Sequence, residues 1–211
     1  MGERLDLALF DLRSGWAALK ILASELGWFG ALGVGLRIAV GQARGEPFKK
    51  LGPPQSRGEE LTRRQAAGAV LLERALARRM ESDQAFNLTQ RVVEEGSLIF
   101  LRAQIPRIER PRVLAMSGDE RLAFLRGISA RFPNSTVEGL KIEGESEFEF
   151  KVVRCLFVEL CARIERPDLA PLFCAGDLLY FEREQPQVRL QRPSTLSEGG
   201  ECCHFQFRWK G

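Results

Sequence analysis

The spacing of apolar residues changes near Ser135, and this change limits the possible folds of the chain more than any other feature. Before Ser135, apolar side chains recur every three or four residues, as in a helix that buries one face. After it, two stretches alternate apolar and polar side chains, for example Phe148, Phe150 and Val152 against charged neighbours. Helices followed by a sheet are therefore expected, which is the α+β class.

The first part of the chain predicts a helical region. Residues 1–45 fit two helices whose junction is rich in glycine, at Gly27, Gly30, Gly33 and Gly35. Residues 46–58 have the paired prolines and charges of a linker or exposed loop. Two long helices should follow, over 59–80 and 82–104.

The boundaries of these helices have recognisable signals. Ser82 is expected to be the N-cap of the second long helix. Two prolines should keep residues 105–112 out of helix. Ser117 and Glu120 have the spacing of a capping box, which predicts a helix from there to about residue 131.

The last part of the chain predicts the order ββααββ. Strands are expected over 136–143, 147–154, 187–193 and 202–210, with helices over 156–165 and 168–181 between the two hairpins. Asp168 is the expected N-cap of the second of these helices. We therefore expect N-terminal helices packed on a small antiparallel sheet of about four strands. The helical region 1–134 and the α+β region 135–211 should form one compact domain.

Charge and hydropathy argue against several classes of protein. The chain has 31 basic and 28 acidic side chains that are mixed along its length, so no basic footprint for nucleic acid emerges. The longest unbroken apolar run, Leu26 to Leu36, is much shorter than the ~20 residues that span a bilayer, so no transmembrane segment is expected. The N-terminal helices are candidates for a homodimer or partner surface, or for a lid over a pocket, and a membrane-surface role is a secondary possibility.

The number of cysteines bears on the compartment. Five is an odd number, and the first residues do not have the pattern that predicts a signal peptide, so none is expected. Reduced thiols in the cytoplasm are therefore expected.

The two thiols beside the single histidine fall on opposite faces of the last strand. Alternation directs Cys203 inward, together with Phe205 and Phe207. Cys202 and His204 then share the polar face, and the sequence places no acid there to orient the imidazole. A solvated histidine is the favoured interpretation over a Cys-His dyad.

Two arginines are expected where apolar strand faces end. Arg192 continues the inward face of its strand, and Arg154 does the same after Val152. A guanidinium near the core needs an anionic partner. That partner would be internal, such as Asp177 or Glu159, or a ligand carboxylate held by two hydrogen bonds.

A thiol and a carboxylate share one helical face. Cys174, Asp177 and Phe181 follow at i, i+3 and i+7. A nearby carboxylate disfavours the thiolate, so a nucleophilic Cys174 would need an arginine beside it. The alternative is a buried cysteine next to an aspartate that bonds backbone.

A metal site is the weaker option, because the cysteines form no CxxC pair. We expect no cofactor. A zinc or iron site, if one exists, would use Cys155, Cys174 and Cys203, with Asp177 or His204 as the fourth ligand.

The last third of the chain resembles the L-2-amino-thiazoline-4-carboxylic acid hydrolase family. The motifs that carry the resemblance are Arg154-Cys155, Cys174-Ala-Gly-Asp177, Arg192-Pro-Ser-Thr195-Leu196, and Gly199 through Cys203-His-Phe205. Two positions depart from the family pattern. Val153 stands where a residue with a hydroxyl group is expected before Arg154, and His204 stands where an acidic residue often follows the last cysteine.

The resemblance implies a hydrolase-like enzyme that opens a small carboxylate-bearing heterocycle at a C=N or amide-type bond, such as the cyclic amidine of an amino-thiazoline. The catalytic residues of the implied site are Asp177, Cys174 and Cys155. Its substrate-binding residues are Arg192, Arg154 and Thr195, and Cys203 lines its pocket. One alternative is a non-catalytic module that binds a small ligand or a partner, as 4-vinyl reductase domains do. A second alternative is a protein with a thiol-liganded metal.

Overall fold

The sheet has four antiparallel strands in the order β1-β2-β4-β3. A computed structural model describes residues 2–143 and 147–210. The strands are β1 (Ser135–Glu143), β2 (Glu147–Cys155), β3 (Val188–Gln191) and β4 (Cys203–Trp209). The closing strands β3 and β4 pair with each other, and β4 also pairs with β2. The predicted α+β class is confirmed.

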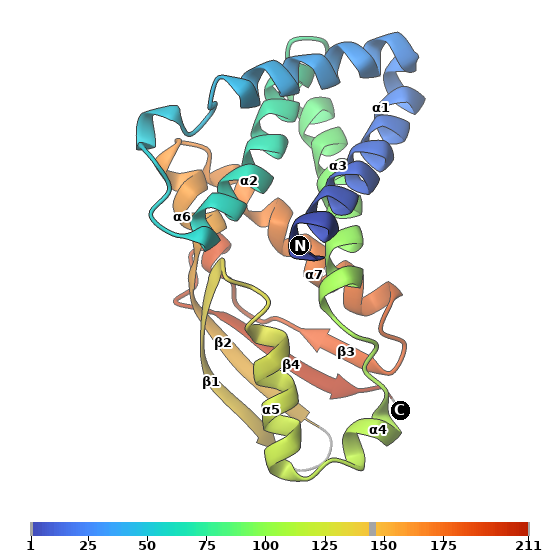
Figure 1. The fold of residues 1–211 in the computed structure, drawn as a ribbon, viewed down its shortest axis with the longest axis vertical. Helices are drawn as coiled ribbons and strands as arrows, with labels where there is room; N and C mark the ends of the chain where they lie inside the picture. Colours follow the sequence, from blue (N-terminus) through green and yellow to red (C-terminus); the bar gives the residue numbers. More distant parts are fainter. Residues whose placement is uncertain (1, 144–146, 211) are drawn as a thin grey trace.

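Seven α-helices accompany the sheet in the described residues. They are α1 (Gly2–Ala43), α2 (Arg57–Leu76), α3 (Ser82–Gln104), α4 (Arg110–Leu114), α5 (Gly118–Ser129), α6 (Leu156–Arg163) and α7 (Ala170–Arg183). Helices α1, α2 and α3 stand at one end of the molecule and the sheet at the other, with α5 in front of the sheet (Figure 1). Helices α6 and α7 connect β2 to β3, so the order ββααββ is as predicted.

Local capping explains where two helices begin. Ser117 Oγ accepts a hydrogen bond from Glu120 N at 3.3 Å, and Glu120 Oε2 accepts one from Ser117 N at 2.7 Å. This is the predicted capping box of α5. In α2 the cap is Ser56, whose Oγ accepts from the Glu59 N–H at 3.1 Å.

Three expected helix boundaries were wrong. Ser82 is the first residue of α3, and the cap position before it is Glu81, which makes no side-chain cap bond. Asp168 does not cap α7, because its carboxylate binds the Arg166 guanidinium at 2.8 Å within a short 3₁₀ turn. The proline-rich stretch after α3 contains α4, since Pro111 lies in its first turn, where a missing N–H is tolerated.

Helix α1 bends at Gly27, whose φ of 70° and ψ of 165° are not helical. The predicted glycine junction is therefore a kink that divides α1 into two legs (Figure 1). The kink requires glycine, because a side chain strongly disfavours this backbone region. Both legs pack on the body of the protein: Leu22 of the first leg and Val34 of the second are buried against α2 and α3.

Aromatic stacking forms the inner face of the sheet. The rings of Phe148 and Phe207 stack at 4.4 Å, and those of Phe150 and Phe205 at 4.8 Å. Phe181 of α7 packs on Phe207 at 5.0 Å. These pairs form the main core together with residues of α3 and α7, so both predicted regions of the chain share one core.

The contact between α3 and α7 depends on Gly176. A Cβ added there would lie 2.7 Å from Ser97 Oγ and closer still to Ser97 Cβ. We predict that Gly176→Ala lowers the free energy of unfolding by about 1–3 kcal/mol, because the two helices must separate to admit a methyl group. Urea denaturation of both proteins measures this difference.

Gly127→Ala is the matched control, because Gly127 is also helical but has open space around it. That variant should gain up to about 1 kcal/mol from helix propensity. A Gly176→Ala protein as stable as the parent would contradict the close packing of α3 on α7.

Candidate active site

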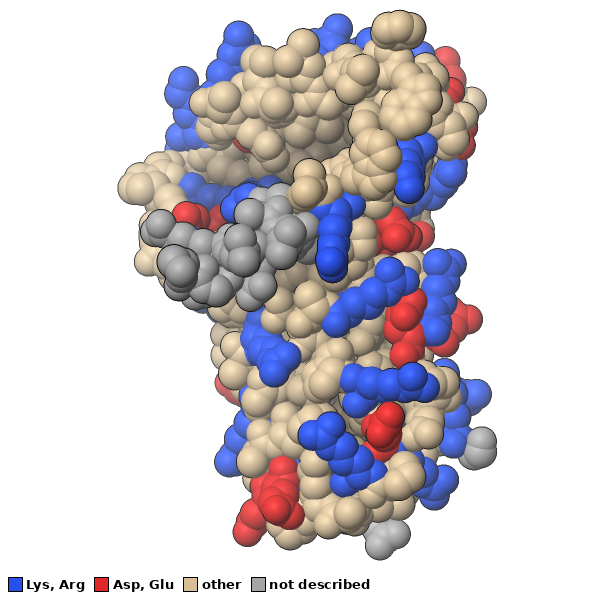
Figure 2. Space-filling view, turned by 45° about the vertical axis from the view of Figure 1, so that its right-hand side comes forward, with Lys and Arg blue, Asp and Glu red and all other residues tan. Residues whose placement is uncertain are grey.

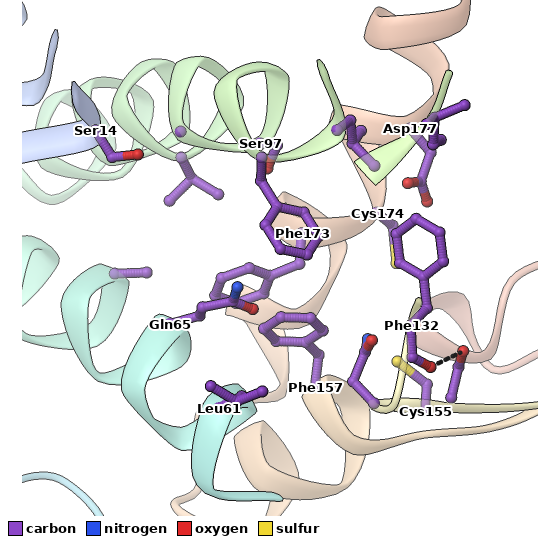
Figure 3. A pocket seen from close by; sticks show the side chains of 18 of the residues that line it. Ser14, Leu61, Gln65, Ser97, Phe132, Cys155, Phe157, Phe173, Cys174 and Asp177 are labelled. Atoms are coloured by element: carbon purple, nitrogen blue, oxygen red, sulfur yellow. Dashed lines mark hydrogen bonds between the residues drawn. The ribbon is translucent and has the colours of Figure 1, made fainter. Parts of the chain in front are cut away.

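A cavity of about 680 Å³ lies between the N-terminal helices and the inner face of the sheet. Most of its wall is apolar. Phenylalanines line it from the sheet and from the helices: Phe148, Phe150, Phe157, Phe173, Phe181, Phe205 and Phe207. Figure 3 shows Phe157 and Phe173 projecting into it, opposite Leu61 and Gln65.

Five of the residues singled out from the sequence line this one cavity. They are Cys155, Cys174, Asp177, Arg192 and Cys203. They come from the end of β2, from α7, from the residue after β3 and from the start of β4. The pairing of β2 with β4 brings Val152 opposite Cys203, and the packing of α7 on β3 brings the other side chains to the same edge.

Arg192 and Asp177 form the ion pair of this site. Arg192 Nη1 donates to Asp177 Oδ2 at 3.0 Å, and Nη2 donates to the carbonyl oxygen of Cys174 at 2.9 Å. The guanidinium also lies over the ring of Phe205, at 5.4 Å. The Arg192 side chain is only 4% exposed, so Asp177 and the Cys174 carbonyl compensate a charge that water cannot reach.

Asp177 points into the cavity, where Figure 3 shows its carboxylate near Cys174 and Phe132. Its side chain is 30% exposed, and it lines the cavity. Burial raises the pKa of Asp177 to about 6, although the charge and hydrogen bond of Arg192 act to lower it. A carboxylate with this pKa can accept and return a proton near neutral pH.

The three thiols that line the cavity are held in the neutral form. Burial raises the pKa of Cys174 to about 12, and the hydrogen bond from Ser197 Oγ at 3.4 Å only partly opposes this. Burial also raises the pKa of Cys155, against the lowering effect of the Val158 and Phe157 N–H groups at the start of α6.

Cys203 behaves in the same way. Burial raises its pKa, while the Leu196 N–H, which donates to its Sγ at 3.3 Å, lowers it. A neutral thiol is a poor nucleophile. The electrostatics of the cavity therefore favour Asp177 over the thiols as the reactive group.

Arg154 lies outside the cavity, so the expectation that it continues the inward strand face is wrong. Thr136 pairs with Arg154 and Val137 with Val152, which leaves Val153 as an extra residue in β2. Such a bulge reverses the alternation beyond it, so Cys155 points inward and Arg154 outward. Arg154 binds the exposed Glu159 through two hydrogen bonds of 2.6 and 2.8 Å.

Thr195 is buried beside the cavity and supports the loop between β3 and β4. Its Oγ1 donates to Glu198 Oε2 at 2.6 Å, and its carbonyl accepts from the Gly200 N–H at 2.9 Å. Both bonds hold the loop that brings Leu196 to Cys203 and Ser197 to Cys174.

His204 lies on the outer face of the sheet, as predicted, but it has an acidic partner. Its Nε2 is 2.8 Å from Glu149 Oε2, and this contact lowers the pKa of Glu149. The pair has no local signal in the sequence, because Glu149 is on β2, diagonal to His204 in the register. Among the residues described, no three metal-ligating side chains lie close enough together to hold an ion, which leaves the thiol-metal alternative without a ligand set there.

The helical wall of the cavity was not predicted. Ser14, Gln65 and Ser97 line it from α1, α2 and α3. These residues belong to no recognisable motif. The one sequence feature that could have identified them is a polar residue on an otherwise apolar helix face.

The comparison with protein families agrees with the motifs at the cavity. The family model of L-2-amino-thiazoline-4-carboxylic acid hydrolase matches residues 60–207, from the first turn of α2 through most of β4. No curated protein and no solved structure is detectably similar to the chain. The match spans most of the chain and includes Cys155, Cys174, Asp177, Arg192 and Cys203, and so the chain belongs to the L-2-amino-thiazoline-4-carboxylic acid hydrolase family.

Proposed function

We propose that the protein is a hydrolase that adds water to the C=N bond of a small carboxylate-bearing heterocycle and thereby opens the ring, with Asp177 as the general base. The observation that carries the proposal is the Asp177 carboxylate itself, which reaches into the cavity with its pKa raised to about 6 and with Arg192 holding it. Membership of a hydrolase family supports the reaction class. The substrate would be a cyclic amidine such as an amino-thiazoline carboxylate.

The reaction needs one water and one proton carrier. Water adds across the C=N bond: its oxygen bonds to the carbon between the ring nitrogen and sulfur, and Asp177 takes one proton from the water and returns it to the ring nitrogen. The carbon–sulfur bond then breaks as the carbonyl forms, and Asp177 carries the proton of the new hydroxyl group to the departing sulfur. The product is a carbamoyl amino acid with a free thiol, so the atoms of substrate and water are all accounted for.

Arg192 acts as a positioning residue in this scheme. Its bonds to Asp177 and to the Cys174 carbonyl fix the carboxylate relative to α7. The described wall of the cavity has two cationic side chains, Arg64 and Arg192, and either would attract the carboxylate of a substrate. Cys174 and Cys155 would act as neutral neighbours that shape the site.

We predict that Asp177→Asn lowers kcat for 2-amino-thiazoline-4-carboxylate by about 10²–10⁴-fold, because the amide cannot accept the proton. Cys174→Ala is the matched control, since it removes a cavity-lining side chain on the same helix face. It should keep kcat within about tenfold of the parent. A large loss with Cys174→Ala and none with Asp177→Asn would establish a thiol mechanism instead.

The pH dependence should report the ionisation of Asp177. Activity should rise with pH through about 6, since the base must be ionised. Arg192→Gln should move this limb to higher pH, because Arg192 lowers the pKa of Asp177. Arg192→Lys retains a positive charge and should keep the limb closer to that of the parent. An acid limb that stays in place in Arg192→Gln would refute the coupling.

A second function, binding of an apolar ligand, is supported by the size and lining of the cavity. A volume of about 680 Å³ is far larger than one small ring requires, and most of the wall is aromatic or aliphatic. Ser14 Oγ points toward the cavity in Figure 3 and has no hydrogen-bond partner within the described part of the chain, which leaves it available to a ligand. A non-catalytic ligand-binding module would have such a cavity.

A variant that fills the apolar part of the cavity distinguishes the hydrolase from the ligand-binding module. Gly96 lines the cavity, and a Cβ added to it would have open space around it, so the side chain of Gly96→Leu should project into the cavity. If the protein holds an apolar ligand, native mass spectrometry should detect it in the parent and show at least about tenfold less in Gly96→Leu. Turnover of a small heterocycle with no ligand retained by the parent would exclude the binding module.

A further inference from the structure

The outer face of α1 exposes a concentration of large apolar side chains. We define this outer face by Leu12, Trp16, Trp28, Phe29, Leu32, Leu36 and Val40, which are all 40% or more exposed. Phe29 is 93% exposed. Among the described side chains, Leu178 is the one exposed large apolar residue outside α1. Monomeric soluble proteins rarely expose so continuous an apolar surface, so this face is expected to contact something apolar.

The second leg of α1 is apolar on two opposite sides. Ala31 and Val34 are fully buried against the body of the protein. Trp28, Leu32 and Leu36 follow every fourth residue and point away from the body. The inner side explains how the leg is attached, and the outer side has no function in the fold.

Positive charge borders this outer face. Within residues 28–44 the charged residues are Arg37 and Arg44, and both are exposed. Arg79 approaches the same leg, since one of its guanidinium nitrogens lies 3.2 Å from where a Cβ on Gly33 would be. In Figure 2 a largely uncharged area covers the upper part of the molecule, with Lys and Arg along much of its margin and some Asp or Glu at its right-hand edge.

The first leg has the same combination of aromatic and cationic groups. Trp16 and Trp28 lie 6.2 Å apart across the kink, and Lys20 Nζ lies 5.4 Å from the Trp16 ring. Within residues 12–27, whose side chains the structure describes, the one acidic residue is Glu25, which is paired with Arg91 at 2.6 Å. Tryptophan beside lysine is typical of a helix at a membrane interface.

We propose that the outer face of α1 docks on the surface of a lipid bilayer that contains anionic lipids. The cationic border complements the negative charge of such a surface, and the apolar side chains would enter the acyl region. A second copy of the chain is disfavoured as the occupant, because it would bring two cationic borders together. The proposal is independent of the reaction proposed above.

Docking in the plane of the bilayer fits α1 better than crossing it. The segment Leu12–Ala43 has a mean hydropathy of 1.3 and is long and apolar enough to span a membrane by length and composition alone. The expected absence of a transmembrane segment rests on the longest unbroken apolar run alone, and it stays a prediction. The kink at Gly27 and the buried inner sides of both legs favour a helix that lies flat. Because α1 also lines the cavity, docking would place the cavity wall beside lipid.

Vesicle flotation of the full chain tests the proposal. We expect the protein to float with vesicles of phosphatidylcholine and phosphatidylserine, to float less with phosphatidylcholine alone, and to be released by salt. Phe29→Ser and Leu32→Ser should each weaken binding about tenfold or more. Arg37→Gln and Arg44→Gln should each weaken it about fivefold. Leu178→Ser is the control, because it removes an exposed apolar residue elsewhere and should bind like the parent.

Two results would overturn the proposal. One is a parent protein that does not float with phosphatidylserine vesicles at low salt. The other is a Phe29→Ser variant that is folded by circular dichroism and floats as well as the parent. A parent dimer that Phe29→Ser dissociates, without any vesicle binding, would assign the face to self-association instead.

Discussion

The buried guanidinium of Arg192 is the constraint on which the arrangement of the site depends. A cation that is 4% exposed must have its charge compensated by protein groups, and here one carboxylate and one carbonyl of the same helix do so. The requirement fixes the rotation of α7 relative to the end of β3. It thereby directs Asp177 and Cys174 toward the cavity instead of toward solvent.

The rest of the architecture explains why the site is hollow. Helices α3 and α7 approach closely at Gly176 and cover the phenylalanines of the sheet. Helices α1 and α2 form a separate apolar cluster with the first half of α3. The two clusters meet around the cavity, so one wall is a packed sheet and the other is a helix whose far side is exposed. Burial in this hollow raises the pKa of Asp177.

Much of the fold could be predicted from local signals, because the period of apolar residues and the capping box at Ser117 are properties of short segments. The polar end of the cavity was also predictable, since strand and helix alternation each place a side chain on a face. Prediction failed where the deciding feature was not local. The bulge at Val153 reverses the direction of Arg154, and the register of β2 and β4 sets Glu149 beside His204. The size of the cavity and its helical wall could not be foreseen, because apolar residues that line a void have the same pattern as those that fill a core.

The ionisation of Asp177 is the most direct measure of the central claim, which is that a desolvated carboxylate tied to Arg192 faces the cavity. Titration of the Asp177 carboxyl carbon by NMR, in the full-length protein with ¹³C-labelled aspartate and assigned by comparison with Asp177→Asn, would measure it. The account predicts a midpoint at about 6. A midpoint near the ordinary value of 3.8 would contradict it, because the carboxylate would then be in contact with bulk water.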